Sequence, residues 1–185
     1  YIEWGNGPAV LVLHGAGGGF DQGRLIAQAF GDRSFRWVSL SRFGYLGSAL
    51  PADASTAAQA NAIVDLLDHL HLQRVSILAF SGGVPPALQF AERHPTRTAC
   101  MALLSSAPFT PYRPPAAARP IPDSIYQALF GSDAVYWAIA RTSPGSLLRA
   151  FDARPELQAE LPLAEQAFLA QLVDAQLQLT HPRRE

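Results

Sequence analysis

The chain has little cysteine, little charge and no long hydrophobic run, and each scarcity narrows what it can do. Its single cysteine, Cys100, excludes a disulfide framework and is compatible with a reducing compartment, so we expect a cytoplasmic protein. Only 16% of the residues are charged, and the formal net charge is −1 without a basic patch or a charged tail. Nucleic acid and anionic lipid are therefore not expected partners. No stretch approaches the length of a membrane span and no signal-like segment is present, so we expect no membrane association.

Apolar side chains are abundant instead. Hydrophobic residues make up 49% of the 185 positions, which is enough for one globular domain with a sizeable core, or one and a part. Cys100 lies in an apolar run between Ala99 and Met101, so we expect a buried structural thiol and not a nucleophile. The sequence starts at Tyr1 without a methionine, which indicates a processed chain or an excerpt.

Short apolar runs alternate with helical patterns over residues 1–108. We expect buried strands at residues 9–13, 36–40, 75–80 and 99–104, after a short strand end before residue 8. The clearest helical pattern covers residues 54–70, where Ala60, Ile63 and Leu67 recur at helical spacing. This alternation predicts an α/β fold, with a mostly parallel sheet and helices on both faces. Loops rich in glycine or serine follow the strands, at the sheet edge where open α/β sheets bind ligands.

The composition changes after residue 108. Residues 109–122 are rich in proline and alanine and are expected to form a linker, and residues 123–185 are expected to be helical. The helices expected there cover residues 123–130, 132–141, 144–151 and 163–179. This helical part is either a cap over a functional site or simply more core.

The most informative stretch is a strand, a sharp turn and a helix around Ser81. The apolar run before Ser81 suits a buried strand, and the two prolines after it, Pro85 and Pro86, fit the first turn of a helix. A serine on such a strained turn needs small residues two positions before and after it, and Ala79 and Gly83 are small. This is the context of a nucleophile elbow. The alternative is an ordinary glycine turn with a surface serine.

A glycine-rich turn follows the run at residues 9–13, and it has two functional interpretations. One is a dinucleotide cradle, but Phe20 occupies the third glycine position and the ribose-binding acid is missing, although Arg42 is placed to bind a 2′-phosphate. The other is a loop whose backbone N–H groups after His14 and Gly15 face the serine. A flexible turn without a function is the third possibility.

Together these features resemble the α/β-hydrolase superfamily with a helical cap. The resemblance covers residues 1–108 and rests on His14-Gly15 with its glycine run, Ser41-Arg-Phe-Gly44, the Ser81 elbow and Leu103-Leu104-Ser105. It implies that Ser81 is the nucleophile. It also implies that the backbone amides of Ala16 and Gly82 form the oxyanion hole, with Gly17 as the alternative to Ala16.

One departure concerns the rest of the triad. In this superfamily an acid and then a histidine follow the serine, on loops after later strands. Only His94 and His181 follow Ser81; the first ends the helix of the elbow and the second trails a helix. We therefore expect that the chain stops before the strands that carry the acid and the histidine. Such a chain would be nearly inactive, and its strand at residues 99–104 would be an aggregation-prone edge.

The resemblance implies an esterase-like serine hydrolase that acts on a small apolar acyl substrate, with no cofactor and no metal. Amide, thioester and carbon–carbon bonds fit the same machinery as esters. The side chains expected to line the substrate pocket are His14, Phe20, Phe80, Phe109 and Trp137. A non-catalytic ligand-binding module on the same fold is the alternative. The sequence does not indicate an oligomeric state.

Overall fold

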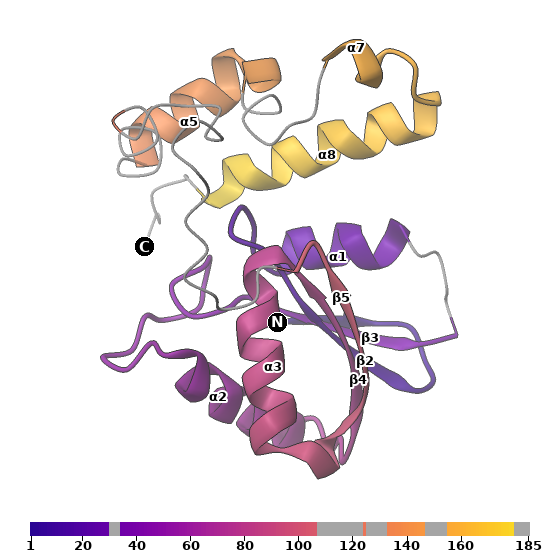
Figure 1. Ribbon diagram of the computed structural model, residues 1–185, viewed down its shortest axis with the longest axis vertical. Coiled ribbons are helices and arrows are strands. Elements are labelled where there is room, and N and C mark those ends of the chain that lie inside the picture. Colours follow the sequence, from indigo (N-terminus) through magenta and orange to yellow (C-terminus); the bar gives the residue numbers. More distant parts are fainter. Residues whose placement is uncertain (30–33, 107–123, 125–132, 147–154, 180–185) are drawn as a thin grey trace. The chain divides into compact units, whose positions relative to one another are not determined.

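A computed structural model describes residues 1–29, 34–106, 124, 133–146 and 155–179. The chain divides into two compact units, Tyr1–Phe109 and Thr110–Glu185, which are described separately below (Figure 1). None of the described helices is long and apolar enough to cross a membrane.

The first unit is built on a five-stranded sheet with the order β1-β3-β2-β4-β5. Its strands are β1 (Ile2–Trp4), β2 (Ala9–Leu13), β3 (Arg36–Leu40), β4 (Val75–Phe80) and β5 (Thr98–Leu104). β1 runs antiparallel to β3, and all the other neighbours are parallel. The predicted α/β fold with a mostly parallel sheet is confirmed.

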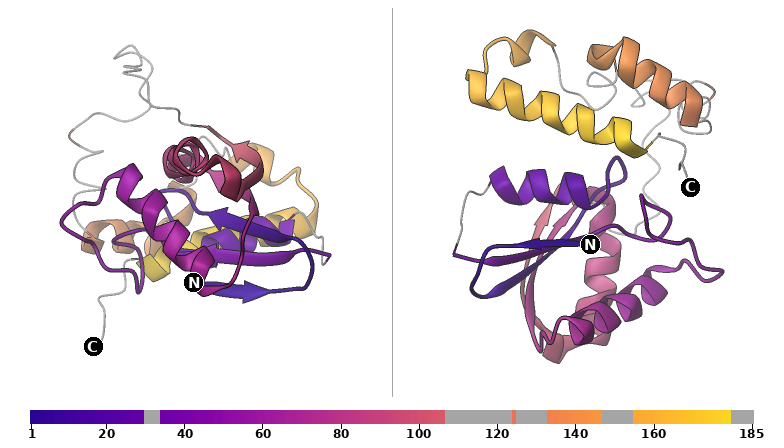
Figure 2. Two further views of the ribbon diagram at one scale, coloured as in Figure 1. Left: turned by 90° about the horizontal axis from the view of Figure 1, so that it is seen from below. Right: turned by 180° about the vertical axis from the view of Figure 1, so that it is seen from behind.

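Helices cover both faces of this sheet (Figure 2). They are α1 (Phe20–Ala29), α2 (Thr56–His69) and α3 (Val84–Arg93), with short 3₁₀ turns at η1 (Ser81–Gly83) and η2 (Pro95–Arg97). Side chains alternate between the faces along a strand, and β2 follows this rule. Leu11 and Leu13 pack in the cluster that includes α2 and α3, whereas Val10 and Val12 pack in the cluster that includes α1.

Local sequence accounts for where two of these helices begin. Ser55 caps α2, because its side chain accepts a hydrogen bond from the Ala58 amide at 3.1 Å. The helix predicted over residues 54–70 therefore begins later than expected, at Thr56, and it ends at His69. Pro85 and Pro86 lie in the first turn of α3, where the missing N–H groups have no partner to lose.

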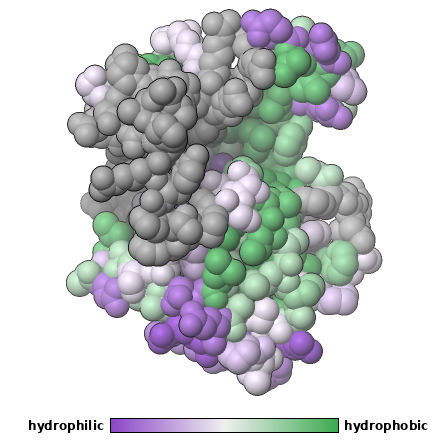
Figure 3. Space-filling model, in the orientation of Figure 1, coloured by the Kyte–Doolittle hydropathy of each residue, from purple (hydrophilic) through white to green (hydrophobic). Residues whose placement is uncertain are grey.

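The environment of β5 differs from the expected buried strand. Residues 99–102 of β5 are exposed, and Met101 keeps 37% of its surface accessible. Cys100 is exposed as well, so the expectation of a buried thiol is wrong. The reason is that β5 pairs only with β4 and is the edge strand of the described sheet. Figure 3 shows hydrophobic surface where Figure 1 places β5.

The second unit is helical where the structure describes it. It contains α5 (Asp133–Thr142), α7 (Pro155–Gln158) and α8 (Leu163–Leu179). α5 and α8 correspond to the helices expected at residues 132–141 and 163–179, whereas α7 was not expected. The proposed linker at 109–122 and most of the helices expected at 123–130 and 144–151 lie outside the described residues.

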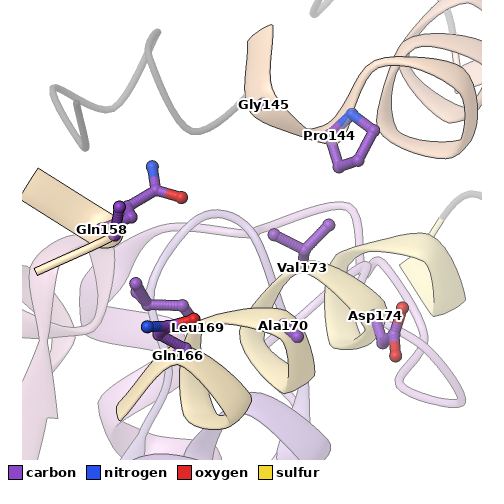
Figure 4. Close-up of a pocket in the computed structure, with 9 residues that line it drawn as sticks. Pro144, Gly145, Gln158, Gln166, Leu169, Ala170, Val173 and Asp174 are labelled. Carbon is purple, nitrogen blue, oxygen red and sulfur yellow. The ribbon is translucent and has the colours of Figure 1, made fainter. Parts of the chain in front are cut away.

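A cavity of about 430 Å³ opens between the helices of this second unit (Figure 4). One wall is a face of α8, and the other side is formed by the segment after α5 and by the end of α7. The residues that line it are Pro144, Gly145, Gln158, Ala159, Gln166, Leu169, Ala170, Val173 and Asp174.

Candidate active site

Ser81 follows β4 directly and has a backbone conformation that side chains rarely adopt. Its φ of +48° lies in the left-handed region, which is uncommon for a residue other than glycine and marks a strained turn. Ala79 is fully buried. A methyl group at Gly83 would collide with the Leu13 carbonyl oxygen and lie 2.7 Å from that of His14. The chain therefore needs small residues on both sides of Ser81, as the elbow pattern predicts.

The turn at Ser81 leads at once into helical backbone. η1 begins at Ser81 and α3 follows it, so the first N–H groups of this segment lack intrahelical partners and carry partial positive charge. Ser81 is half-buried, and its hydroxyl has no hydrogen-bond partner within the part of the chain that the structure describes. A reacting anion beside Ser81 would therefore meet unpaired donors.

The glycine-rich loop after β2 lies next to this turn, because β2 and β4 are parallel neighbours. A methyl group at Gly82 would lie 3.3 Å from the amide nitrogen of Ala16. Ala16 is exposed, and no acceptor for its N–H is found within residues 1–29 and 34–106. Gly17 is half-buried beside it. The two amides expected to form an oxyanion hole thus come from segments that touch.

His14 is fully buried at the start of this loop, and both of its ring nitrogens have partners. Nε2 accepts a hydrogen bond from the Arg42 backbone N–H at 2.9 Å, so the proton is assigned to Nδ1, which lies 2.7 Å from the Gly15 carbonyl oxygen. Burial, and then the nearby Arg42 charge, lower the pKa of His14 to about 3. The imidazole is therefore neutral at physiological pH, and its position is that of a structural residue.

Two further side chains hold the same loop. Arg42 donates from Nε to the His14 carbonyl at 3.1 Å and from Nη2 to the Gly15 carbonyl at 3.0 Å. Its guanidinium lies over the Tyr45 ring, 4.8 Å from the centroid, and burial lowers its pKa. On the other side, buried Gln22 accepts from the Gly15 N–H through Oε1 at 2.8 Å. Every polar backbone atom from the His14 carbonyl to the Gly15 carbonyl therefore has a hydrogen-bond partner.

These contacts argue against the dinucleotide cradle. A phosphate cradle needs free backbone N–H groups along the turn. Here the Gly15, Gly19 and Phe20 N–H groups already donate to side chains of the protein, namely Gln22, Asp21 and Ser41. These N–H groups of the glycine-rich loop are therefore held by hydrogen bonds within the protein and are not available to a phosphate.

The side chains expected to line a pocket lie in different places. The Phe80 ring packs on Gly15, where an added methyl group would be 2.9 Å from Cδ1. Phe20 begins α1, and its carbonyl accepts from the Ser39 hydroxyl at 2.8 Å. Trp137 belongs to α5 of the second unit and is 37% exposed, and Phe109 lies outside the described residues. Their role in binding stays a prediction.

No described histidine is placed to act as a base for Ser81. His14 has both nitrogens engaged, and His94 caps the far end of α3, where it contacts Asn61 at 3.3 Å. The ten residues of α3 separate the two ends by about 15 Å. His69 and His71 are exposed at the end of α2. His181 lies outside the described residues.

Two glutamines that position the site loops were not recognised in the sequence. Gln22 holds the loop after β2, and Gln59 accepts from the Phe43 N–H at 2.8 Å and so holds the loop after β3. Both are buried. The available signal was a polar residue on the apolar face of a helix. The described residues contain no group of three or more His, Cys, Asp or Glu side chains that could hold a metal ion.

A family comparison agrees with this geometry. Residues 8–136 match the family model described as alpha/beta hydrolase fold, which is more than half of the chain. The chain belongs to the alpha/beta hydrolase fold family. The predicted resemblance is therefore confirmed.

Relatives of this alpha/beta hydrolase are found among curated proteins and solved structures. The chain is 35% identical to an uncharacterized protein of Mycobacterium tuberculosis over 107 residues, 57% of this chain and 31% of that protein. It is 31% identical to the uncharacterized hydrolase YcgS of Bacillus subtilis over 110 residues, 57% of this chain and 37% of YcgS. The matches thus span about a third of the length of these relatives.

Two solved structures share the fold. An alpha/beta hydrolase fold protein from Nakamurella multipartita is 24% identical with a TM-score of 0.63, over 97% of this chain and 64% of that one. The epoxide hydrolase VrEH1 from Vigna radiata is 22% identical with a TM-score of 0.56, over 96% of this chain and 64% of that one. At this identity the likeness concerns the fold alone.

Proposed function

We propose that the protein is a serine hydrolase in which Ser81 attacks the carbonyl carbon of a small apolar ester. The Ser81 hydroxyl proton passes to a histidine base, the alcohol leaves with that proton, and a water molecule then releases the acid from the acyl-enzyme. The observation that carries this proposal is the left-handed turn at Ser81, between β4 and the N-terminus of a helical segment. The Ser81 hydroxyl has no hydrogen-bond partner among the described residues. A strained turn at this place is what a nucleophile elbow requires.

The proposed oxyanion hole consists of the Ala16 and Gly82 backbone N–H groups, with Gly17 as the alternative to Ala16. Two preorganised donors stabilise the negative charge that develops on the carbonyl oxygen in the transition state. The close approach of Gly82 to the Ala16 nitrogen supports this assignment, as does the absence of an acceptor for Ala16 in residues 1–29 and 34–106.

The histidine and the acid of the triad are proposed to come from residues other than those described. The support is that His14, His69, His71 and His94 all have other contacts or lie away from Ser81. Loss of the base in a serine triad costs on the order of 10⁶ in turnover and leaves about 10³–10⁴ over water. Without that histidine and acid, Ser81 is therefore expected to be nearly inactive.

A non-catalytic ligand-binding module is the second candidate. One observation favours it, namely that the described residues supply no base for Ser81. Reaction of the folded protein with a fluorophosphonate separates the two candidates, because the reagent phosphonylates an activated serine. We expect Ser81 to react much faster in the folded protein than in urea, and the Ser81→Ala variant not to react. A folded protein that reacts no faster than the unfolded one would indicate the binding module.

A further inference from the structure

We propose that Arg42 is a positioning residue that aims the Ala16 N–H at the reacting oxygen. This assignment rests on the proposed function, since it concerns the same oxyanion hole. It goes beyond that function by giving a role to a residue in a loop 28 positions away from His14. The role follows from how the peptide unit between Gly15 and Ala16 is held.

The Gly15 carbonyl and the Ala16 N–H belong to one planar trans peptide unit, so the two bonds point in opposite directions. Fixing the carbonyl therefore fixes the N–H. The Gly15 carbonyl oxygen accepts two hydrogen bonds, one from Arg42 Nη2 at 3.0 Å and one from His14 Nδ1 at 2.7 Å. The Ala16 N–H is thus directed away from these two side chains, and it has no acceptor within residues 1–29 and 34–106.

Arg42 also holds the preceding peptide unit. Its Nε donates to the His14 carbonyl at 3.1 Å, and its own backbone N–H donates to His14 Nε2 at 2.9 Å. Two N–H groups of a rigid planar guanidinium therefore bind successive carbonyls, which a lysine ammonium cannot reproduce with the same geometry. Tyr45 packs on both residues, since its ring lies 4.8 Å from the guanidinium carbon and 4.8 Å from the His14 ring centroid.

The charge of Arg42 suits the same role. A methyl group at Gly82 would lie 3.3 Å from Arg42 Nη2, so the guanidinium lies beside the proposed oxyanion donors. Within the part of the chain that the structure describes, no carboxylate forms an ion pair with Arg42. A partly buried cation that has no carboxylate partner among the described residues polarises the Gly15–Ala16 peptide and favours negative charge nearby.

Arg97 provides a matched control. It also donates to two backbone carbonyls, from Nε to Gln73 at 2.7 Å and from Nη2 to Leu72 at 2.8 Å. It precedes β5, at the opposite end of the strands from Ser81. Loss of Arg97 therefore removes the same kind of contact, together with its ion pair to Asp68 at 2.7 Å, and leaves the oxyanion loop unchanged.

The test is steady-state hydrolysis of p-nitrophenyl butyrate by the intact protein and its Arg42→Met, Arg42→Lys, Arg97→Met and Ser81→Ala variants. An oxyanion contact acts in the transition state, so we expect Arg42→Met to lower kcat by about 10²-fold while KM changes less than about threefold. Arg42→Lys is expected to fall in between, and methylguanidinium is expected to restore part of the kcat of Arg42→Met. Arg97→Met is expected to lower the melting temperature and to keep kcat within about twofold.

The outcomes distinguish this assignment from the proposed function. A wild-type rate that Ser81→Ala does not reduce would overturn the proposed function and the role of Arg42 with it. A rate that depends on Ser81 but is equal in wild type and Arg42→Lys and Arg42→Met would overturn only the role of Arg42. Equal losses of kcat in Arg42→Met and Arg97→Met would assign Arg42 to stability alone. If Arg42→Met does not fold, a wild-type kcat in Arg42→Lys overturns the assignment, and a loss of kcat without a change in KM supports it.

Discussion

Ser81 and Ser105 occupy matching positions on neighbouring strands. Each is the first residue after its strand, and Phe80 at the end of β4 pairs with Leu104 at the end of β5. Their φ values are +48° and +49°, so both serines carry the same backbone strain. Ser81 is half-buried beside the glycine-rich loop, whereas Ser105 is exposed. The left-handed backbone conformation alone therefore does not distinguish Ser81 from Ser105.

The surroundings of Ser81 distinguish it from Ser105. Ser81 opens a helical segment, Gly83 lets that segment approach the ends of Leu13 and His14, and Ala16 lies opposite. In the account proposed above these neighbours supply donors to a developing oxyanion.

Replacing each serine by alanine should separate the two sites most strongly. In the intact protein we expect Ser81→Ala to lower kcat for p-nitrophenyl butyrate on the order of 10⁶-fold, because the nucleophile is lost. Ser105→Ala is expected to keep kcat within about twofold, as surface substitutions usually do. Steady-state assays at matched protein concentration measure both. Comparable losses in the two variants would remove the distinction.

Gly83, beside Ser81, is expected to be sensitive to added volume. A methyl group there meets the backbone carbonyls of Leu13 and His14, which cannot move aside as a flexible side chain can. We expect Gly83→Ala to lower the free energy of unfolding by about 3 kcal/mol. Gly47→Ala is the control, since nothing lies within 4 Å of its added methyl group. Urea denaturation measures both, and an equal midpoint for the two variants would contradict this account.

His14 should make the stability of the protein depend on pH. Its pKa is about 3 in the folded chain and 6.5 in the unfolded chain, so between these values only the unfolded chain binds the proton. Stability is therefore full above pH 6.5 and falls as the pH decreases, by about 1.4 kcal/mol per pH unit. Between pH 7 and 5 the loss from this group is about 2 kcal/mol. We expect the pH slope of unfolding to weaken in His14→Gln and to persist in His69→Gln, whose histidine is exposed.

β5, the strand that precedes Ser105, is expected to promote self-association of the chain, unlike the central strand β4. Residues 99–102 are exposed on the edge strand, and such an edge can pair with another chain. We expect Met101→Lys to reduce self-association of the 185-residue chain in light scattering, while the free energy of unfolding changes by less than about 0.5 kcal/mol. An unchanged scattering intensity at high concentration would show that the chain does not self-associate through this edge.

Much of the first unit could be predicted from the sequence because its signals are local. The strands at residues 9–13, 36–40 and 75–80 have the predicted bounds, since each is a short, mostly apolar run that is followed by a polar residue. The turn at Ser81 could be predicted too, because the small residues Ala79 and Gly83 around it are visible in the sequence. The atoms that require a small residue at Gly83 belong to Leu13 and His14, which are distant in the sequence.

The remaining features depend on contacts between distant segments. The pairing of His14 with Arg42 joins residues 28 positions apart, and no spacing rule indicates it. Gln22 and Gln59 look like ordinary polar helix residues until the loops that they hold are in place. The exposure of Cys100 depends on whether another segment covers β5, which the apolar run around it does not reveal.

The most direct test of the central claim is to trap the acyl-enzyme. The intact protein is mixed with p-nitrophenyl butyrate, quenched in acid within the first turnovers, digested and mapped by mass spectrometry. This account predicts a butyryl group on the peptide that contains Ser81, lost on further incubation, and none on the peptide that contains Ser105. Turnover with no butyryl group on Ser81, or with equal modification of both serines, would contradict it.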